Sequence, residues 1–181
     1  MQSIARAGAH TRLRDGRFVP TFPNASYIFV RREYERWDPK LPGHRIVDYN
    51  VDVFDRSVLP VMEAGLAELV SDRHRISPSV EIQPAHGHTA GHSVLHLVSL
   101  SKEAYFTGDV LHHPIQMVDP SIHFPGCDNL EKAIETHRRF VDLCAERSAL
   151  IIPAHFPAPY AGRLRRYNSG VIFEALEGGV A

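Results

Sequence analysis

Histidines concentrate in one part of this sequence. The chain has 12 His among 181 residues, and four of them fall between positions 86 and 96. His88 and His92 belong to the turn Gly-His-Thr-Ala-Gly-His at residues 87–92, directly before an apolar segment typical of a strand. Neutral imidazoles on a stiff scaffold are common zinc ligands, and glycine lets the backbone approach closely. The spacing therefore indicates a metal site.

Two other strand ends carry side chains of the metal-ligand type. Asp109 follows the segment Tyr105–Gly108, and His155 comes two residues after Ile151-Ile152-Pro153. A carboxylate directly after a strand can bridge two cations, because each oxygen can bind one. Taken alone, a histidine beside a strand is more often a hydrogen-bonded structural residue, and an Asp after Gly is usually a turn residue or a helix N-cap. The combination is what points to metal chemistry.

In its order and spacing, this combination resembles the metallo-β-lactamase-fold hydrolases. The stretches 11–25, 111–116 and 154–159 are similar to the quorum-quenching lactonase and methyl-parathion-hydrolase-like branch, so the resemblance runs from about Gly8 to Phe173. It implies an α/β fold, the αβ/βα sandwich. It also implies two metal ions, usually zinc, in a groove at the edge of that sandwich.

The resemblance also implies roles for single residues. His92 is similar to the ligand of one metal ion, Asp109 to the carboxylate that bridges both ions, and His155 to the ligand of the second ion. His86 stands where a proline is common, and we expect it to be exposed rather than liganding. The supporting or groove-lining positions are His88, His112 and His113.

One motif of the family is missing from the sequence. The remaining ligands come from His-x-His-x-Asp-His, which the chain does not contain. The likeness of residues 11–25 places that motif immediately upstream of Gly8. We therefore expect an N-terminally truncated fold, a single partial domain over residues 1–181 with poor order at 1–10 and 174–181. Each zinc would keep about two protein ligands, below the three typical of catalytic sites. Zinc occupancy should then be reduced or absent.

Two functions from different classes follow. The first is a metal-dependent hydrolase that cleaves a lactone, ester or phosphotriester through metal-bound hydroxide, since bound metal lowers the pKa of water to roughly 7. The alternative is a non-catalytic truncated fragment or pseudoenzyme with an incomplete metal site. A partner chain that supplies the absent ligands is a third possibility. The expected partners are a small-molecule substrate and a second copy of the chain, bound through an exposed sheet or helix surface.

Composition excludes several other classes. With 20 Lys and Arg against 21 Asp and Glu, the net charge of −1 gives no general attraction to nucleic acid or to an anionic membrane. The sequence has no apolar run of the length that a membrane span requires. Only two cysteines, Cys127 and Cys144, are present, which favours a reducing compartment and a cytoplasmic location. Ser93 has no evident triad partners, so a serine hydrolase is not indicated.

Interleaved strands and helices must position these residues. The apolar pattern predicts a helix over residues 55–70 and a longer one that begins at Asp128, with Asp128 as N-cap and Glu131 as its capping partner. A turn of helix is expected around residues 32–37. Cys144 and His137 lie on the apolar stripe of the longer helix and should be packed. The predicted strands are 27–30, 80–83, 93–100, 104–106, 150–152 and 171–173.

Overall fold

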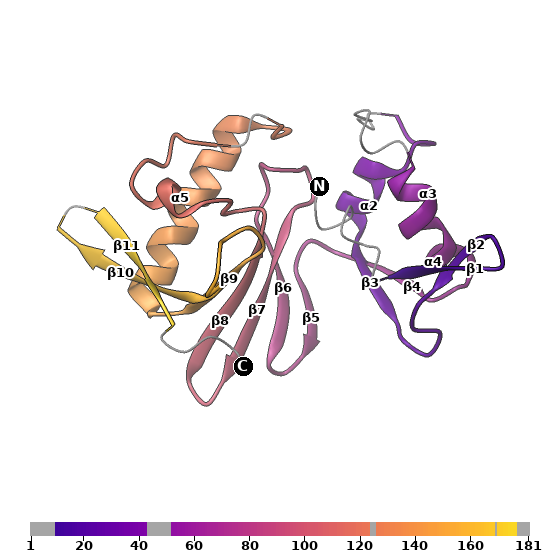
Figure 1. Cartoon of the computed structure of the whole chain (residues 1–181), viewed down its shortest axis with the longest axis horizontal. Helices are drawn as coiled ribbons and strands as arrows, with labels where there is room; N and C mark the ends of the chain where they lie inside the picture. Colours follow the sequence, from indigo (N-terminus) through magenta and orange to yellow (C-terminus); the bar gives the residue numbers. More distant parts are fainter. Residues whose placement is uncertain (1–9, 43–51, 124–125, 169, 177–181) are drawn as a thin grey trace. The chain divides into compact units, whose positions relative to one another are not determined.

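The computed structural model describes residues 10–42, 52–123, 126–168 and 170–176. The chain divides into two compact units, Met1–Ser71 and Asp72–Ala181, and Figure 1 labels the elements of each. Within the described ranges, no helix combines the length and the apolar character needed to cross a membrane. Most residues predicted to be poorly ordered, 1–9 and 177–181, lie outside the described ranges, and the single-domain expectation stays a prediction.

The described residues of the first unit form a hairpin, a pair of parallel strands and three short helices. Asp15 and Gly16 both have positive φ, at 50° and 76°, which suits the two-residue turn of the hairpin. The elements are β1 (Thr11–Arg14), β2 (Arg17–Pro20), β3 (Tyr27–Val30), α2 (Arg31–Trp37), α3 (Val53–Ser57), α4 (Leu59–Glu63) and β4 (Ala67–Val70). The strand predicted at 27–30 and the helical turn at 32–37 are confirmed.

The prediction of one helix over residues 55–70 is wrong. Two helices of five residues stand there, and β4 follows in place of the last helical turn. Pro60 lies in the first turn of α4, where its missing N–H is tolerated, and Gly65 has φ of 68° directly after the helix. β4 then pairs in parallel with β3. The apolar spacing of residues 66–70 suits both a helix and a buried strand, and the pairing with β3 decides between them.

The second unit is a seven-stranded sheet with one long helix. The sheet order is β11-β10-β9-β8-β7-β6-β5, and only β8 and β9 pair in parallel. The chain passes from β8 to β9 through the 3-10 helix η3 (Pro114–Met117) and α5 (Leu130–Arg147). The strands are β5 (His74–Ser77), β6 (Val80–Pro84), β7 (Ser93–Ser99), β8 (Lys102–Gly108), β9 (Leu150–Pro153), β10 (Gly162–Tyr167) and β11 (Gly170–Ala175).

All five strands predicted in this unit are present. β7 and β8 form a hairpin, and its turn residues Leu100 and Ser101 both have positive φ. Alternation along β8 buries Tyr105 and Thr107, whereas Phe106 on the other face is 43% exposed. β5 and β10 differ from the sequence prediction, which had no strands there, because these strands are short or rich in charged residues.

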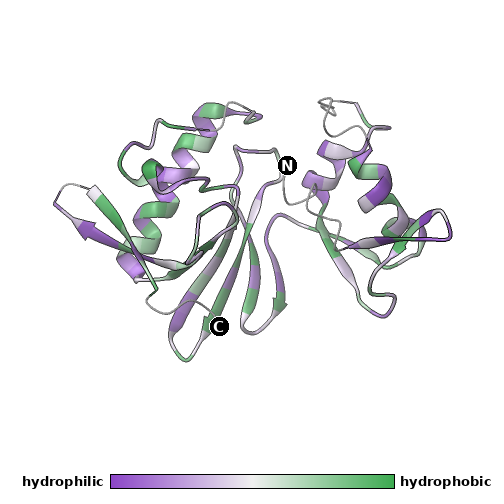
Figure 2. Cartoon of the chain, viewed as in Figure 1, coloured by the Kyte–Doolittle hydropathy of each residue, from purple (hydrophilic) through white to green (hydrophobic). Residues whose placement is uncertain are grey.

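The core lies between α5 and the sheet. Buried residues of the helix, Phe140, Val141 and Cys144, join Tyr105 and Ile151 of the strands in one apolar cluster. Figure 2 shows hydrophobic and hydrophilic residues side by side along α5 and the strands, as expected for elements with one buried face. Burial of the predicted packed residues Cys144 and His137, at 0% and 1% exposure, is confirmed.

The start of α5 differs from the prediction. The helix begins at Leu130, and its N-cap is Asn129, whose side chain accepts a hydrogen bond from the Lys132 N–H. Asp128 lies one residue earlier and accepts a hydrogen bond of 3.1 Å from the Ala90 N–H. The predicted Asp128–Glu131 capping pair is therefore wrong, because Asp128 is committed to the loop that carries the histidines.

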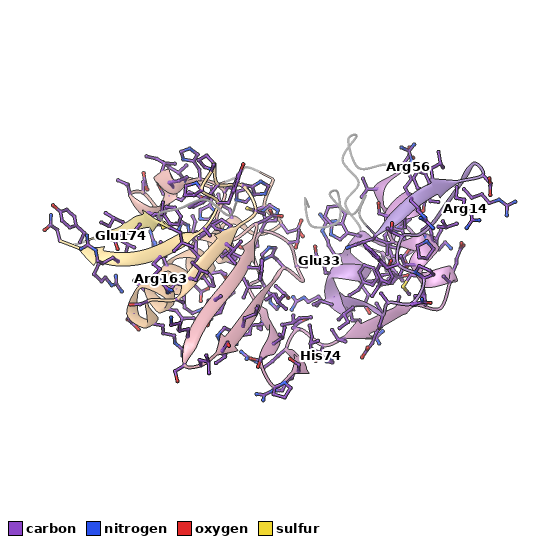
Figure 3. All side chains as sticks on the ribbon, turned by 60° about the horizontal axis from the view of Figure 1, so that its bottom comes forward. Arg14, Glu33, Arg56, His74, Arg163 and Glu174 are labelled. Carbon is purple, nitrogen blue, oxygen red and sulfur yellow. The ribbon has the colours of Figure 1, made fainter. Side chains whose placement is uncertain are left out.

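The basic residues near the C-terminus pair with acidic neighbours on the surface. Arg163 on β10 and Glu174 on β11 are register partners, and both are labelled in Figure 3. Arg165 contacts Glu174, and Arg166 contacts Asp142 of α5 at 2.7 Å. These contacts bind β10 to its neighbours.

Candidate metal centre

The proposed ligands gather at one edge of the large sheet. Because β8 and β9 are parallel, their carboxyl ends meet at the same edge, and Gly108 lies opposite Pro153 in the register. Asp109 follows Gly108 and His155 follows Pro153 by two residues, so the topology brings both side chains together. The loop between β6 and β7 reaches the same edge, since β7 is antiparallel to β8.

The N-terminal part of α5 and the two residues before it hold the histidine loop in place. The amides of Asp128 and Asn129 donate to the carbonyls of His88 and Gly87, at 2.9 and 3.1 Å. Thr136 donates to the His86 carbonyl at 2.7 Å. Gly87 is necessary here: its φ is 132°, and a Cβ would lie 2.3 Å from the backbone nitrogen of Ala133.

The carboxylate of Asp109 is at the centre of the site. Its side chain is only 2% exposed, and its two oxygens face different imidazoles. Oδ1 lies 2.6 Å from Nε2 of His155 and 4.0 Å from Nε2 of His112. Oδ2 lies 3.5 Å from Nε2 of His88. A buried carboxylate requires such partners, because an unpaired buried charge is costly.

His92 has a different environment from these three histidines. Its Nδ1 is 3.1 Å from the Ala85 carbonyl, and its Nε2 is 3.0 Å from the backbone nitrogen of Asp109. A carbonyl only accepts and an amide N–H only donates, so Nδ1 carries the proton and Nε2 accepts. Both ring nitrogens therefore engage the backbone, and the lone pair that a metal would need points at the Asp109 N–H.

Burial favours the neutral form of His88 and His112. It lowers the pKa of His88 to about 3 and that of His112 to about 4, although the nearby Asp109 carboxylate opposes both shifts. Burial also disfavours the charged form of Asp109, yet nearby positive charge and the hydrogen bond from His155 prevail and lower the pKa of this carboxyl. Neutral imidazoles beside an ionised carboxylate are the protonation states that metal binding requires.

The donor set fits a zinc ion. One ligand atom each from Asp109, His112 and His155 lies within 4.8 Å of the other two, and this trio is the one such group found among the described residues. Imidazole nitrogen and carboxylate oxygen are both ordinary zinc ligands. The Cys127 sulfur is 3.6 Å from Nδ1 of His88, where it can orient that ring.

The two other histidines considered from the sequence have local contacts. His113 is exposed and caps η3, with Nδ1 accepting a hydrogen bond from the Ile115 N–H. His86 is half-buried rather than exposed, and its Nε2 lies 3.1 Å from an Asp72 oxygen.

Gln116 is a functional candidate that the sequence analysis missed. Its side chain is 1% exposed, and Oε1 accepts hydrogen bonds from the backbone amides of His112 and His113 at 2.7 and 3.0 Å. Its Nε2 donates to the Ile122 carbonyl at 2.8 Å. The loop after Asp109 is thus fixed by a buried amide. Only the spacing from His112 to Gln116 could have signalled it.

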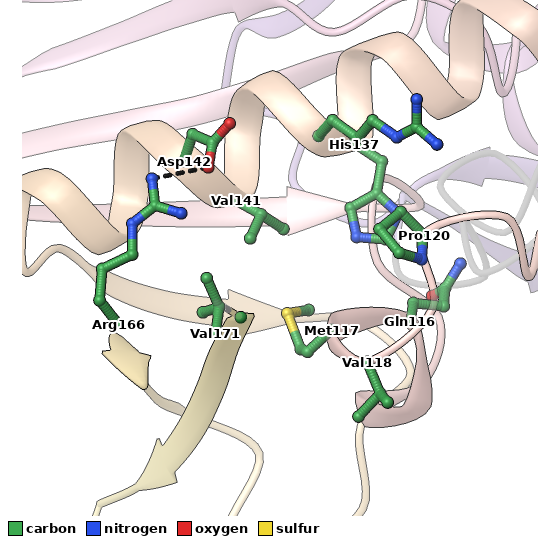
Figure 4. A pocket seen from close by; sticks show the side chains of 11 residues that line it. Gln116, Met117, Val118, Pro120, His137, Val141, Asp142, Arg166 and Val171 are labelled. Atoms are coloured by element: carbon green, nitrogen blue, oxygen red, sulfur yellow. Dashed lines mark ion pairs between the residues drawn. The ribbon is translucent and has the colours of Figure 1, made fainter. Parts of the chain in front are cut away.

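A separate cavity of about 260 Å³ lies between α5, η3 and β11. Figure 4 shows Val141, Val171 and Met117 on its walls and the ion pair of Arg166 with Asp142 at one side. It shares no lining residue with the group around Asp109.

Comparisons with known proteins place the fold. No family model matches the chain, and no curated protein matches it by sequence. Among solved structures, AidC, a dizinc quorum-quenching lactonase in complex with a product, is similar at TM-score 0.70 and 20% identity, over 88% of this chain and 57% of that one. The hydrolase AbOPH of the β-lactamase superfamily is similar at TM-score 0.79 and 20% identity, over 95% of this chain and 60% of that one.

A probable metal-dependent hydrolase from Staphylococcus aureus is similar at TM-score 0.67 and 15% identity, over 89% of this chain and 56% of that one. The chain thus spans less than two thirds of the length of these structures. The similar structures are metallo-β-lactamase superfamily hydrolases, lactonases among them, as the sequence motifs indicated. The chain therefore has an α/β structure of the metallo-β-lactamase fold, over about three fifths of the length of its solved neighbours.

Proposed function

We propose that this chain is part of a zinc-dependent hydrolase that cleaves a lactone, an ester or a phosphotriester. The observation that carries the proposal is the buried Asp109 carboxylate, with His155 against one oxygen and His88 against the other. A carboxylate placed this way can serve two metal ions. The similarity of the fold to a dizinc lactonase and to other hydrolases supports the same reaction class.

We assign the ligand role to His88 and the supporting role to His92, the reverse of what the family resemblance implied. Nε2 of His88 faces the carboxylate, whereas Nε2 of His92 accepts a hydrogen bond from the Asp109 N–H. A ligand must offer a lone pair toward the carboxylate side of the site, and His88 does so. Asp109 and His155 keep the roles that the sequence suggested.

Zinc bound at such a site would lower the pKa of a water molecule and polarise the substrate oxygen. The residues of the chain position the ligand atoms. His92 fixes the backbone of Asp109, and the Asp109 oxygens point to separate sides of the site. Cys127 lies at Nδ1 of His88, and when Nδ1 carries the proton, Nε2 is left to bind the metal.

Metal analysis combined with hydrolysis tests the proposal. The full chain is loaded with zinc, dialysed, and assayed for zinc content and for hydrolysis of an N-acyl homoserine lactone and of paraoxon. We expect bound zinc in the unmodified chain and a clear loss of it in Asp109→Asn and His155→Ala. His74→Ala, on strand β5, is the control and should retain zinc.

The two measurements separate the alternatives. Zinc binding with hydrolysis at background would support a non-catalytic chain with a metal site. Unchanged zinc content in Asp109→Asn would contradict the site itself.

A further inference from the structure

We propose that His112 is a third protein ligand of a single metal ion bound between Oδ1 of Asp109 and His155. This inference rests on the proposed function and deepens it. It gives one metal position a complete set of three ligands from within this chain, the number typical of catalytic zinc. The sequence motifs assigned His112 only to the groove.

The positions of the donor atoms carry the proposal. The ligand atoms of Asp109, His112 and His155 all lie within 4.8 Å of one another. Ligands of one tetrahedral zinc are about 3.4 Å apart, given bond lengths near 2.1 Å, so small side-chain rotations bring the three atoms onto one ion. His155 and His112 approach the same oxygen, Oδ1, at 2.6 and 4.0 Å.

The two imidazoles are also aligned with each other. Their rings stack with a centroid separation of 4.9 Å and an interplanar angle of 1°. His112 is half-buried, and burial together with stacking restricts its rotamers. A ring held this way loses little conformational entropy when it binds a metal.

The backbone that carries His112 is fixed from the opposite side. The buried Gln116 side chain accepts hydrogen bonds from the amides of His112 and His113 and donates to the Ile122 carbonyl. Gln116 is therefore a positioning residue. His113 emerges from the same short segment, yet it is exposed and caps η3. It offers a matched control of the same residue type.

The test is a metal titration of the full 181-residue chain. Co²⁺ is added to the metal-free protein while visible absorption is recorded, and calorimetry with Zn²⁺ gives stoichiometry and affinity. We expect about one equivalent to bind tightly, with the intense absorption of a site of low coordination number. His112→Ala should weaken binding at least about ten-fold, since even outer partners of metal ligands contribute 10- to 100-fold. His113→Asn, which keeps a capping side chain, should bind as the unmodified chain does.

Each outcome has a distinct meaning. Equal affinity in His112→Ala and the unmodified chain, with loss in His155→Ala, would overturn the role of His112 and leave the proposed function intact. No binding to the unmodified chain would overturn both. Circular dichroism and thermal melting of each variant establish that it folds. Gln116→Ala is a second test of how His112 is positioned. This variant should bind the metal more weakly although all three ligands remain.

Discussion

The Nε2 atom of His92, directly before β7, accepts a hydrogen bond of 3.0 Å from the backbone N–H of Asp109, directly after β8. Gly108 makes this contact possible. Its φ is 51°, and a Cβ at this position would lie 2.9 Å from the same nitrogen. His92 thus sets the position of the backbone that carries the Asp109 carboxylate.

Replacing His92 by alanine should therefore destabilise the second unit. The buried Asp109 N–H and the Ala85 carbonyl would both lose a partner, at about 1–3 kcal/mol for each unsatisfied group. Urea denaturation should show a loss of about 2–6 kcal/mol in the free energy of unfolding. For His74→Ala on β5 the change should stay within about 0.5 kcal/mol. Similar values for the two variants would contradict the role of His92.

Replacing Gly87 by alanine should cost much more than the same change at Gly16. Both residues have positive φ, but a Cβ at Gly87 would lie 2.3 Å from the backbone of α5. A Cβ at Gly16 would have no other atom within 4 Å. We expect about 3 kcal/mol or more for Gly87→Ala and about 1 kcal/mol for Gly16→Ala, measured by urea denaturation. Since His88 follows Gly87, zinc affinity should fall as well. A Gly87→Ala chain as stable as Gly16→Ala would show that the loop is not packed on α5.

The cap of α5 gives a prediction about helix stability alone. Asn129→Ala removes the acceptor of the Lys132 N–H and should lower the free energy of unfolding by about 1 kcal/mol. Asn129→Asp keeps an acceptor and should change it by only a few tenths. Thermal melting, monitored by circular dichroism, checks both expected values. An equal loss in the two variants would mean that Asn129 is not the N-cap.

Glu103 provides a pH-dependent contribution. Burial raises the pKa of this carboxyl, but the hydrogen bonds from Arg147 and His96 prevail and lower it below its ordinary value of 4.5. A carboxyl with a depressed folded-state pKa stabilises the protein above its unfolded pKa and loses that contribution as the pH falls through the folded value. Glu103→Gln should therefore cost about 1–3 kcal/mol near pH 7.

The difference in the free energy of unfolding between the unmodified chain and Glu103→Gln should shrink below about pH 4.5. Urea denaturation at pH 7, 5 and 4 measures it, with Glu174→Gln on the exposed strand β11 as the control. A difference that does not change with pH would assign the contribution of Glu103 to packing rather than charge.

Local sequence determined much of the second unit. Apolar runs next to Gly and Pro located β6 to β9, and residue types at strand ends located Asp109 and His155, because both signals depend on neighbours in the chain. The first unit was harder to predict from the sequence. Residues 66–70 suit a helix or a strand equally, and only the pairing of β4 with β3 decided.

The sequence alone determined that a carboxylate and several imidazoles follow strand ends in a metallo-β-lactamase-like order. The tertiary structure decided which imidazoles face the carboxylate. His88 and His92 have similar local sequences, and only the hydrogen bonds of the loop to α5, and of His92 to the Asp109 backbone, distinguish them. His112 and Gln116 likewise gain their roles from contacts across the loop after β8. Ring orientation depends on partners distant in the chain, and residue spacing does not contain that information.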